Sequence, residues 1–124
     1  MMHPEIAARL APLIEAGTVA TTAQLDAEAL YSARDSADYE QLWSDRRLAY
    51  EYLPTDDDHW QTALAAQRQL ARSGRHCAVG MADLLIAAIA SAHEVTLIHY
   101  DADFEIAAEV MPVRHQWVLP RGSI

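Results

Sequence analysis

Several residue types are scarce or absent in this chain of 124 residues, and each shortage excludes a class of site. Cys77 is the single cysteine, which excludes an internal disulfide and a zinc site built from cysteines. The four glycines are isolated from one another, so the sequence holds no glycine-rich phosphate loop. The six histidines show neither the HExxH spacing nor a comparable arrangement, which makes zinc chemistry a poor candidate.

Long hydrophobic runs are also missing. The longest, residues 84–92 (LLIAAIASA), is interrupted by Ser91 and is much too short to span a bilayer. Glu5 and Arg9 lie where the apolar segment of a secretion signal would be. Because 52% of the residues are hydrophobic, the chain can bury a core without metals or disulfides. We therefore expect one soluble, cytoplasmic domain that makes no contact with a membrane.

Lysine is absent, so all nine basic residues are arginines, and they face eighteen acidic ones for a net charge of −9. This balance argues against nucleic-acid binding through a broad basic face. A few arginines can still position a phosphodiester, because their guanidinium forks grip phosphate bidentately. Arginine-only usage is also what a GC-rich genome produces. The acidic excess is tolerable if some carboxylates hold cations.

The order of helical and extended patterns indicates an α/β fold. A helix over Pro4–Ala16 contains Pro12, which can kink it, and glycine or proline punctuates most of the other segments. Strands alternating with helices predict a parallel sheet with crossover helices, and the apolar run in VTLI (95–98) suits a strand covered on both faces. The remaining predicted helices are Ala23–Arg34, Ser36–Tyr50, His59–Ser73, Met81–His93 and Asp101–Glu109, and the predicted strands are Thr18–Thr21, Glu51–Pro54, Val95–Tyr100 and Gln116–Leu119.

Three aspartates are placed where a site forms in a parallel sheet, outside the carboxyl ends of strands. Asp101 directly follows the strand VTLIHY, Asp103 comes two residues later, and Asp83 opens the apolar helix that leads into the same strand. We expect Asp83 and Asp101 to converge at one edge of the sheet. Each aspartate alone is also explained by capping and by the helix dipole. As a cluster without cysteine, they suit hard cations such as Mg²⁺ or Mn²⁺.

Two other acidic segments have a structural explanation. Glu28 lies in the second helix among apolar neighbours, near the edge of the core, and an ordinary solvated glutamate fits this pattern too. Residues 55–58 (TDDD) look like a metal cluster, but three acids at the start of a helix are accounted for by capping and the helix dipole.

Two motifs together resemble the C-terminal signature of the VapC-type toxins among the PIN-domain ribonucleases. They are ADLLIAA at residues 82–88 and YDADF at residues 100–104, and DAEALYS at residues 26–32 matches the family's acidic position on the second helix. The resemblance covers essentially the whole chain. It implies a three-layer PIN-like fold in which a central parallel sheet is flanked by helices.

One feature departs from the family pattern. Members begin with a central strand that ends in a metal-binding aspartate, whereas this sequence opens Met1-Met2-His3-Pro4 directly into a helix. We therefore expect the first strand, on the order of ten residues, to be missing. A start assigned too far downstream, a sequence lacking its first residues, and a truly shorter protein all explain this.

The resemblance further implies an activity and partners. Asp83, Asp101 and Glu28 would bind Mg²⁺ or Mn²⁺, Asp103 would support them or add a ligand, and the metal would drive hydrolysis of RNA. The expected function is thus the toxin of a type II toxin–antitoxin system, with a VapB-type antitoxin as partner and a homodimer as assembly. Helices Pro4–Ala16 and Ala23–Arg34 are candidate walls of the antitoxin groove. A catalytically inactive module that retains antitoxin binding or dimerisation is the alternative, and cleavage of structured DNA is a second one.

Overall fold

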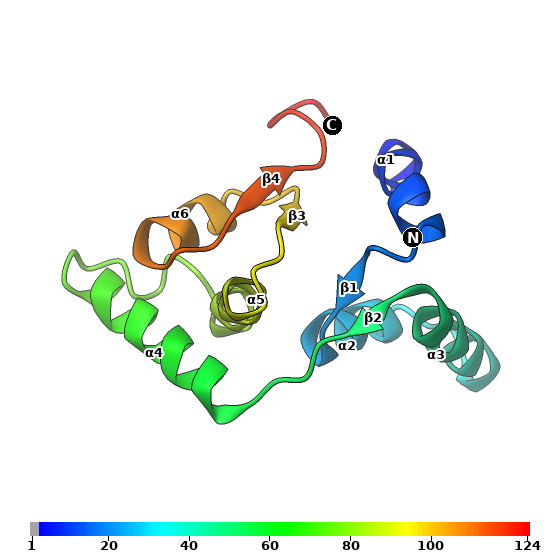
Figure 1. Ribbon diagram of the computed structural model, residues 1–124, viewed down its shortest axis with the longest axis horizontal. Helices are drawn as coiled ribbons and strands as arrows, with labels where there is room; N and C mark the ends of the chain where they lie inside the picture. The colour runs from blue at the N-terminus through cyan, green and yellow to red at the C-terminus, as the bar shows by residue number, and fades with distance from the viewer. Residues whose placement is uncertain (1–2) are drawn as a thin grey trace. The chain divides into compact units, whose positions relative to one another are not determined.

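The computed structural model describes residues 3–124 and divides the chain into two compact units, Met1–Pro54 and Thr55–Ile124 (Figure 1). Each unit combines α-helices with one pair of parallel strands. The predicted α/β class with parallel strands is confirmed, and the hydrogen-bonded strands form two separate two-stranded sheets. That the chain is a single domain stays a prediction. No helix within residues 3–124 is both long and apolar enough to cross a membrane.

The N-terminal unit runs α1–β1–α2–α3–β2. Helix α1 continues through Pro12 and ends before Gly17, whose φ of +70° is a left-handed conformation that glycine adopts without strain. Side-chain oxygens of Thr22 and Asp35 cap α2 and α3. Strands β1 and β2 pair in parallel, with Ala20 opposite Glu51. The elements are α1 (Pro4–Glu15), β1 (Ala20–Thr21), α2 (Ala23–Tyr31), α3 (Ser36–Ala49) and β2 (Glu51–Tyr52).

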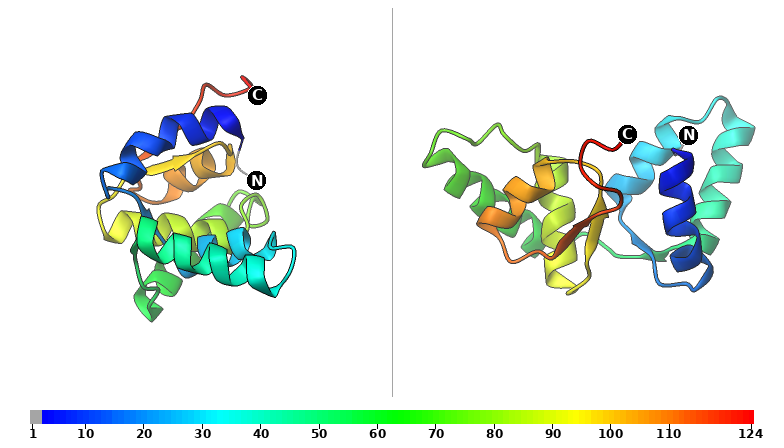
Figure 2. Two further views of the ribbon diagram at one scale, coloured as in Figure 1. Left: turned by 90° about the vertical axis from the view of Figure 1, so that its right-hand side faces the viewer. Right: turned by 90° about the horizontal axis from the view of Figure 1, so that it is seen from above.

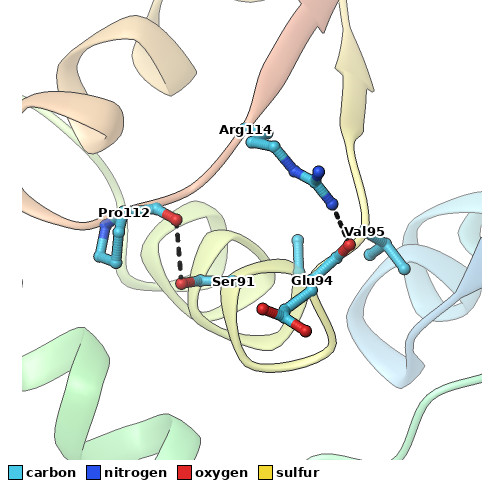
Figure 3. Close-up of a pocket in the computed structure, with 6 residues that line it drawn as sticks. Ser91, Glu94, Val95, Pro112 and Arg114 are labelled. Carbon is cyan, nitrogen blue, oxygen red and sulfur yellow. Dashed lines mark hydrogen bonds between the residues drawn. The ribbon is translucent and has the colours of Figure 1, made fainter.

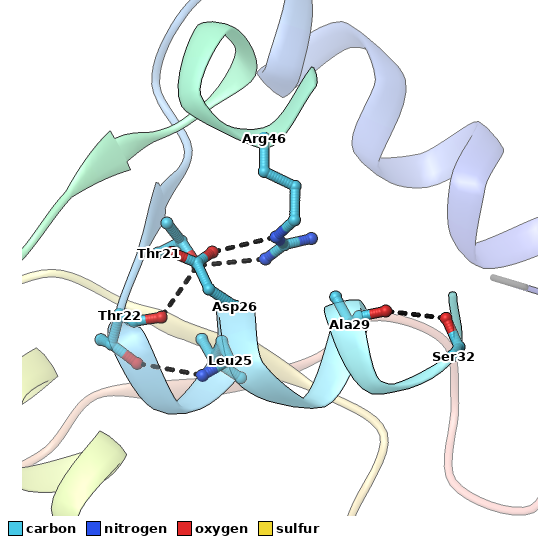
Figure 4. A network of polar contacts seen from close by, with 7 residues as sticks. All are labelled: Thr21, Thr22, Leu25, Asp26, Ala29, Ser32 and Arg46. Carbon is cyan, nitrogen blue, oxygen red and sulfur yellow. Dashed lines mark hydrogen bonds and ion pairs between the residues drawn. The ribbon is translucent and has the colours of Figure 1, made fainter. Parts of the chain in front are cut away.

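A buried polar network ties β1, α2 and α3 together (Figure 4). The Thr21 hydroxyl donates to Oδ1 of Asp26 over 2.9 Å. Nε of Arg46 donates to the same oxygen over 2.9 Å, and its Nη2 donates to the Thr21 hydroxyl over 3.1 Å. Because Asp26 is buried, its charge needs such partners to be tolerated. The network therefore fixes the junction of the three elements.

The C-terminal unit is built around α5 (Met81–Ala92), in which residues 84–90 are all buried. One face of α4 (Asp57–Ala71), carrying Ala63, Ala66 and Leu70, contributes to the same core. Phe104 and Ala107 of α6 (Asp103–Val110) are buried as well. Strands β3 (Leu97–His99) and β4 (His115–Trp117) pair in parallel, with Leu97 opposite His115. The colours of Figure 2 trace the chain from β3 through α6, in orange, to β4.

Several boundaries differ from those predicted. The helix expected from His59 begins at Asp57, because Asp56 and His59 form a reciprocal capping box. The helix expected from Asp101 begins at Asp103, which leaves Asp101 in the preceding turn. The predicted strands are longer than the hydrogen-bonded ones. The predicted strand Glu51–Pro54, for example, is a strand only over Glu51–Tyr52.

Candidate metal centre

Three carboxylates meet at the carboxyl end of β3. One carboxylate oxygen from each of Asp83, Asp101 and Asp103 lies within 4.8 Å of the others. Asp101 lies in the turn between β3 and α6, Asp103 is the first residue of α6, and Asp83 comes from the first turn of α5. The convergence of Asp83 and Asp101 predicted from the strand order is confirmed, and Asp103 joins them.

Asp83 is held by the rigidity of the helix it opens. Gly80 is the N-cap of α5, and the seven residues that follow Asp83 are buried. Burial of that run fixes the helix axis and therefore the direction of its first turn. The partial positive charge at a helix N-terminus also favours a carboxylate at this position. Asp83 itself is half-buried.

The turn that carries Asp101 is stabilised by two hydrogen bonds. The backbone N–H of Asp103 donates to Oδ1 of Asp101 over 2.9 Å, which closes a local turn. The backbone N–H of Asp101 donates to Nδ1 of His99 over 3.1 Å. Asp101 is exposed and Asp103 is half-buried, so the cluster opens to solvent on one side. A ligand from solvent therefore has access to these oxygens.

His99 supports this turn from inside the unit, and sequence reasoning did not identify it. Its Nδ1 accepts from Asp101, so the proton of the neutral ring lies on Nε2, 3.0 Å from Nδ1 of His115. Burial lowers the pKa of His99 below its usual 6.5, and the nearby His115 lowers it further. The neutral ring therefore keeps Nδ1 available as an acceptor. The only sequence signal was its position at the end of an apolar strand.

The fourth predicted site residue, Glu28, lies exposed on α2 in the N-terminal unit. The structure thus brings together three of the four predicted residues within one unit, and the role of Glu28 stays a prediction. Its neighbour Asp26 is buried and ion-paired with Arg46, so that carboxylate has a structural task. Asp56 is the N-cap of α4, which agrees with the capping explanation of TDDD.

The donor set of the cluster fits a hard divalent cation. Carboxylate oxygens are the ligands that Mg²⁺ and Mn²⁺ take, and metal–oxygen distances of about 2.1 Å separate ligand oxygens by roughly 3–4 Å. Oxygens already within 4.8 Å of one another need only small side-chain adjustments to reach that spacing. A dication also relieves the repulsion among three clustered negative charges.

A cavity of about 320 Å³ lies at the opposite end of α5 (Figure 3). There Arg114 donates to the carbonyl oxygen of Glu94, and the Ser91 hydroxyl donates to the carbonyl oxygen of Pro112 over 3.3 Å. These bonds tie the end of α5 and the segment before β3 to the segment before β4. The cavity is lined by Ala90, Ser91, Glu94, Val95, Pro112 and Arg114.

The fold and the site together define an α/β protein with an acidic cluster at the carboxyl end of a parallel strand. The PIN domain family model matches residues 3–110. Two proteins of Mycobacterium tuberculosis are each 38% identical: Ribonuclease VapC21 over 97% of this chain and 87% of its own length, and Ribonuclease VapC51 over 100% and 89%. The chain belongs to the PIN-domain family.

Solved structures agree with this assignment. The crystal structure of VapBC-5 from Mycobacterium tuberculosis, a member of the VapBC family of toxin–antitoxin systems, aligns with a TM-score of 0.61 at 30% identity, covering 80% of this chain and 81% of that one. VapBC2 from Rickettsia felis, bound to a DNA fragment from its promoter, shares the fold with a TM-score of 0.64 at 22% identity, covering 88% and 81%.

Proposed function

We propose that this chain is the toxin of a type II toxin–antitoxin system and hydrolyses RNA with the help of Mg²⁺ or Mn²⁺. The observation that carries the proposal is the convergence of Asp83, Asp101 and Asp103 within 4.8 Å at a strand end. It occurs in a PIN-family chain that is 38% identical to two proteins named as VapC ribonucleases.

In this proposal Asp83, Asp101 and Asp103 hold the metal, and the role of Glu28 as a metal ligand stays a prediction from the family resemblance. The bound metal lowers the pKa of a water molecule and stabilises negative charge on the attacked phosphodiester. The chain's own residues supply position. Helix α5 holds Asp83, and the turn closed by the Asp103 N–H holds Asp101. His99 keeps that turn in place by accepting the Asp101 N–H.

The proposed partners are RNA as substrate, a VapB-type antitoxin and a second copy of this chain. Helix α1 supports an antitoxin groove, because none of its residues is buried. Its apolar stripe consists of Ile6, Leu10 and Ile14, which are half-buried, and Leu13, which is 39% exposed. An apolar stripe that is only partly buried can pack against an amphipathic partner helix.

Cleavage of a labelled RNA by the purified chain tests the function. We expect cleavage with Mg²⁺ or Mn²⁺, none with EDTA, and at least a hundredfold loss for Asp83→Ala, in line with the effect of removing key metal-site groups. Asp58→Asn is the matched control, since Asp58 is an exposed carboxylate at the start of another helix in the same unit.

The alternative outcomes are distinct. If Asp83→Ala retains full metal-dependent cleavage, the proposed site is wrong. If the chain cuts no RNA under any of these conditions but binds a cognate antitoxin, the chain is an inactive binding module and the nuclease proposal is wrong.

A further inference from the structure

Arg47 lies between two aromatic rings at the end of α3. Its guanidinium carbon is 4.5 Å from the centroid of the Trp43 ring and 4.7 Å from that of Tyr52. Trp43 is one helical turn earlier on α3, and Tyr52 is on β2. The two rings are 41% and 39% exposed, and Arg47 is exposed as well. The three side chains therefore form a surface that solvent reaches.

Arg47 differs from the neighbouring arginine in the partners of its charge. Arg46 also lies over a ring, 4.8 Å from the centroid of Tyr50, but its charge is matched by Asp26 over 2.9 Å. Within residues 3–124, Arg47 forms no ion pair with a carboxylate. In a chain of net charge −9, a cation without an acidic partner is open to an external anion.

We propose that Trp43, Arg47 and Tyr52 form a binding surface for single-stranded RNA. This inference rests on the proposed function and adds a substrate-binding site to it. The guanidinium plane stacks on the rings, which leaves its N–H edges available for a phosphate, and the exposed ring faces accept a base. The rings hold the arginine in place before binding, so less side-chain entropy is lost when RNA arrives.

Charge complementarity favours RNA over a protein as the occupant. The acidic excess of the chain repels a polyanion in general, so a ribonuclease of this composition needs local cations that no carboxylate neutralises. Arg47 meets that need, and the adjacent aromatic faces suit bases, which stack without sequence preference. An acidic protein segment is the competing occupant, and the experiment separates the two.

Fluorescence anisotropy of a short fluorescein-labelled single-stranded RNA, measured in EDTA so that no cleavage occurs, tests the surface. We expect Arg47→Gln to weaken RNA binding about tenfold. We also expect a shallower slope of the logarithm of the binding constant against the logarithm of the salt concentration, by roughly the amount of one phosphate contact. Arg34→Gln is the matched control: it removes the same charge from an arginine that is paired with Asp38 before the opposite end of α3. We expect it to change affinity by less than about twofold.

Tryptophan fluorescence provides a second readout that loss of folding does not imitate. A base stacked on Trp43 quenches its emission, so RNA-induced quenching is expected to vanish in Trp43→Phe. It is expected to persist in Trp60→Phe, which replaces a tryptophan of equal 41% exposure that lies under no arginine within the described residues. Circular dichroism confirms that each variant is folded.

Binding and cleavage outcomes are separable. If the parent chain cleaves RNA but Arg47→Gln binds it as tightly as the parent, the RNA surface is wrong while the nuclease proposal stands. If the parent never cleaves yet loses RNA affinity on Arg47→Gln, the binding surface stands without the activity. If RNA affinity is unchanged and Arg47→Gln instead alters self-association in light scattering, the surface is a protein contact and the proposal is overturned.

Discussion

Neutralising one carboxylate of the candidate metal centre is expected to stabilise the metal-free protein. Asp101→Asn suits this test, because the amide keeps the Oδ1 acceptor for the Asp103 N–H. The bond from the Asp101 backbone to His99 does not involve the replaced group. The substitution removes the negative charge of Asp101, which repels the negative charges of Asp83 and Asp103.

The magnitude follows from the geometry. Two unit charges 4.8 Å apart repel by about 0.9 kcal/mol in the dielectric of water and by about 3.5 kcal/mol at an effective dielectric of 20. Asp101 is exposed, so the lower figure applies, and physiological salt reduces it by roughly half. Closer approach than 4.8 Å and the partial burial of the other two carboxylates act in the opposite direction. Asp101→Asn removes two of the three repulsions, and we expect a gain of about 1 kcal/mol, or about 3–5 °C in Tm.

Metal is expected to reverse this order of stability. At a Mn²⁺ concentration of about 100 Kd, binding stabilises the folded parent chain by about 2.7 kcal/mol. Asp101→Asn loses a ligand, so its Tm is expected to rise much less. The variant is therefore the more stable chain in EDTA, and the parent is the more stable chain in Mn²⁺.

Thermal melts of both chains in EDTA and in MnCl₂, followed by circular dichroism, measure the effect. Asp58→Asn is the control, because Asp58 is an exposed carboxylate in the first turn of α4. Its loss removes a favourable helix-dipole interaction and is expected to lower Tm slightly in both buffers. If Asp101→Asn is less stable than the parent in EDTA, or gains as much from Mn²⁺, the argument from clustered charge is refuted.

Two further predictions concern the buried side chains of Asp26 and His99. Arg46→Met leaves the buried Asp26 carboxylate without its cation, so we expect the free energy of unfolding, measured by urea denaturation, to fall by about 3 kcal/mol. The Arg46→Met/Asp26→Asn double variant is expected to recover most of this loss. Additive losses would contradict this. Because the pKa of His99 is lowered in the folded chain, the unfolded chain binds a proton at His99 more readily than the folded chain does. The contribution of His99 to the free energy of unfolding is therefore fully present above pH 6.5 and declines as the pH falls below it. His99→Gln is expected to flatten the decline of Tm between about pH 7 and pH 5, and an unchanged slope would refute the assignment.

The acidic cluster could be predicted because its position depends on topology alone. Asp83 lies in the first turn of a buried helix and Asp101 follows strand β3, in which buried and exposed residues alternate. Because the helix runs antiparallel to the strand that follows it, the start of α5 lies beside the end of β3. The sequence predicted an apolar helix over Met81–His93, and in the structure all of residues 84–90 in α5 are buried. The local hydrophobic pattern is sufficient to predict a helix whose own residues form one continuous apolar run.

Long-range polar pairs could not be predicted in this way. Asp26 and Arg46 are 20 residues apart, and His99 and His115 are 16 apart. Neither pair has a local motif, because its geometry depends on how two separate elements pack and on the register of β3 against β4. No feature of the sequence distinguishes Asp26, which is buried, from a solvent-exposed carboxylate on a helix. Sequence periodicity gives the face of a helix but not the partner of a polar group on it.

The clustering of like charges has a consequence for how the site is built. Three carboxylates within 4.8 Å repel one another by about 1.5 kcal/mol in sum at physiological salt, which flexible loops would relieve by moving apart. Here the elements on both sides are held by burial: full burial of Leu84, Leu85 and Ile89 stabilises the unit by about 1.5–3 kcal/mol for each side chain. The buried core therefore limits how far the carboxylates can move apart, and the repulsion that it maintains adds to the affinity for any cation that enters.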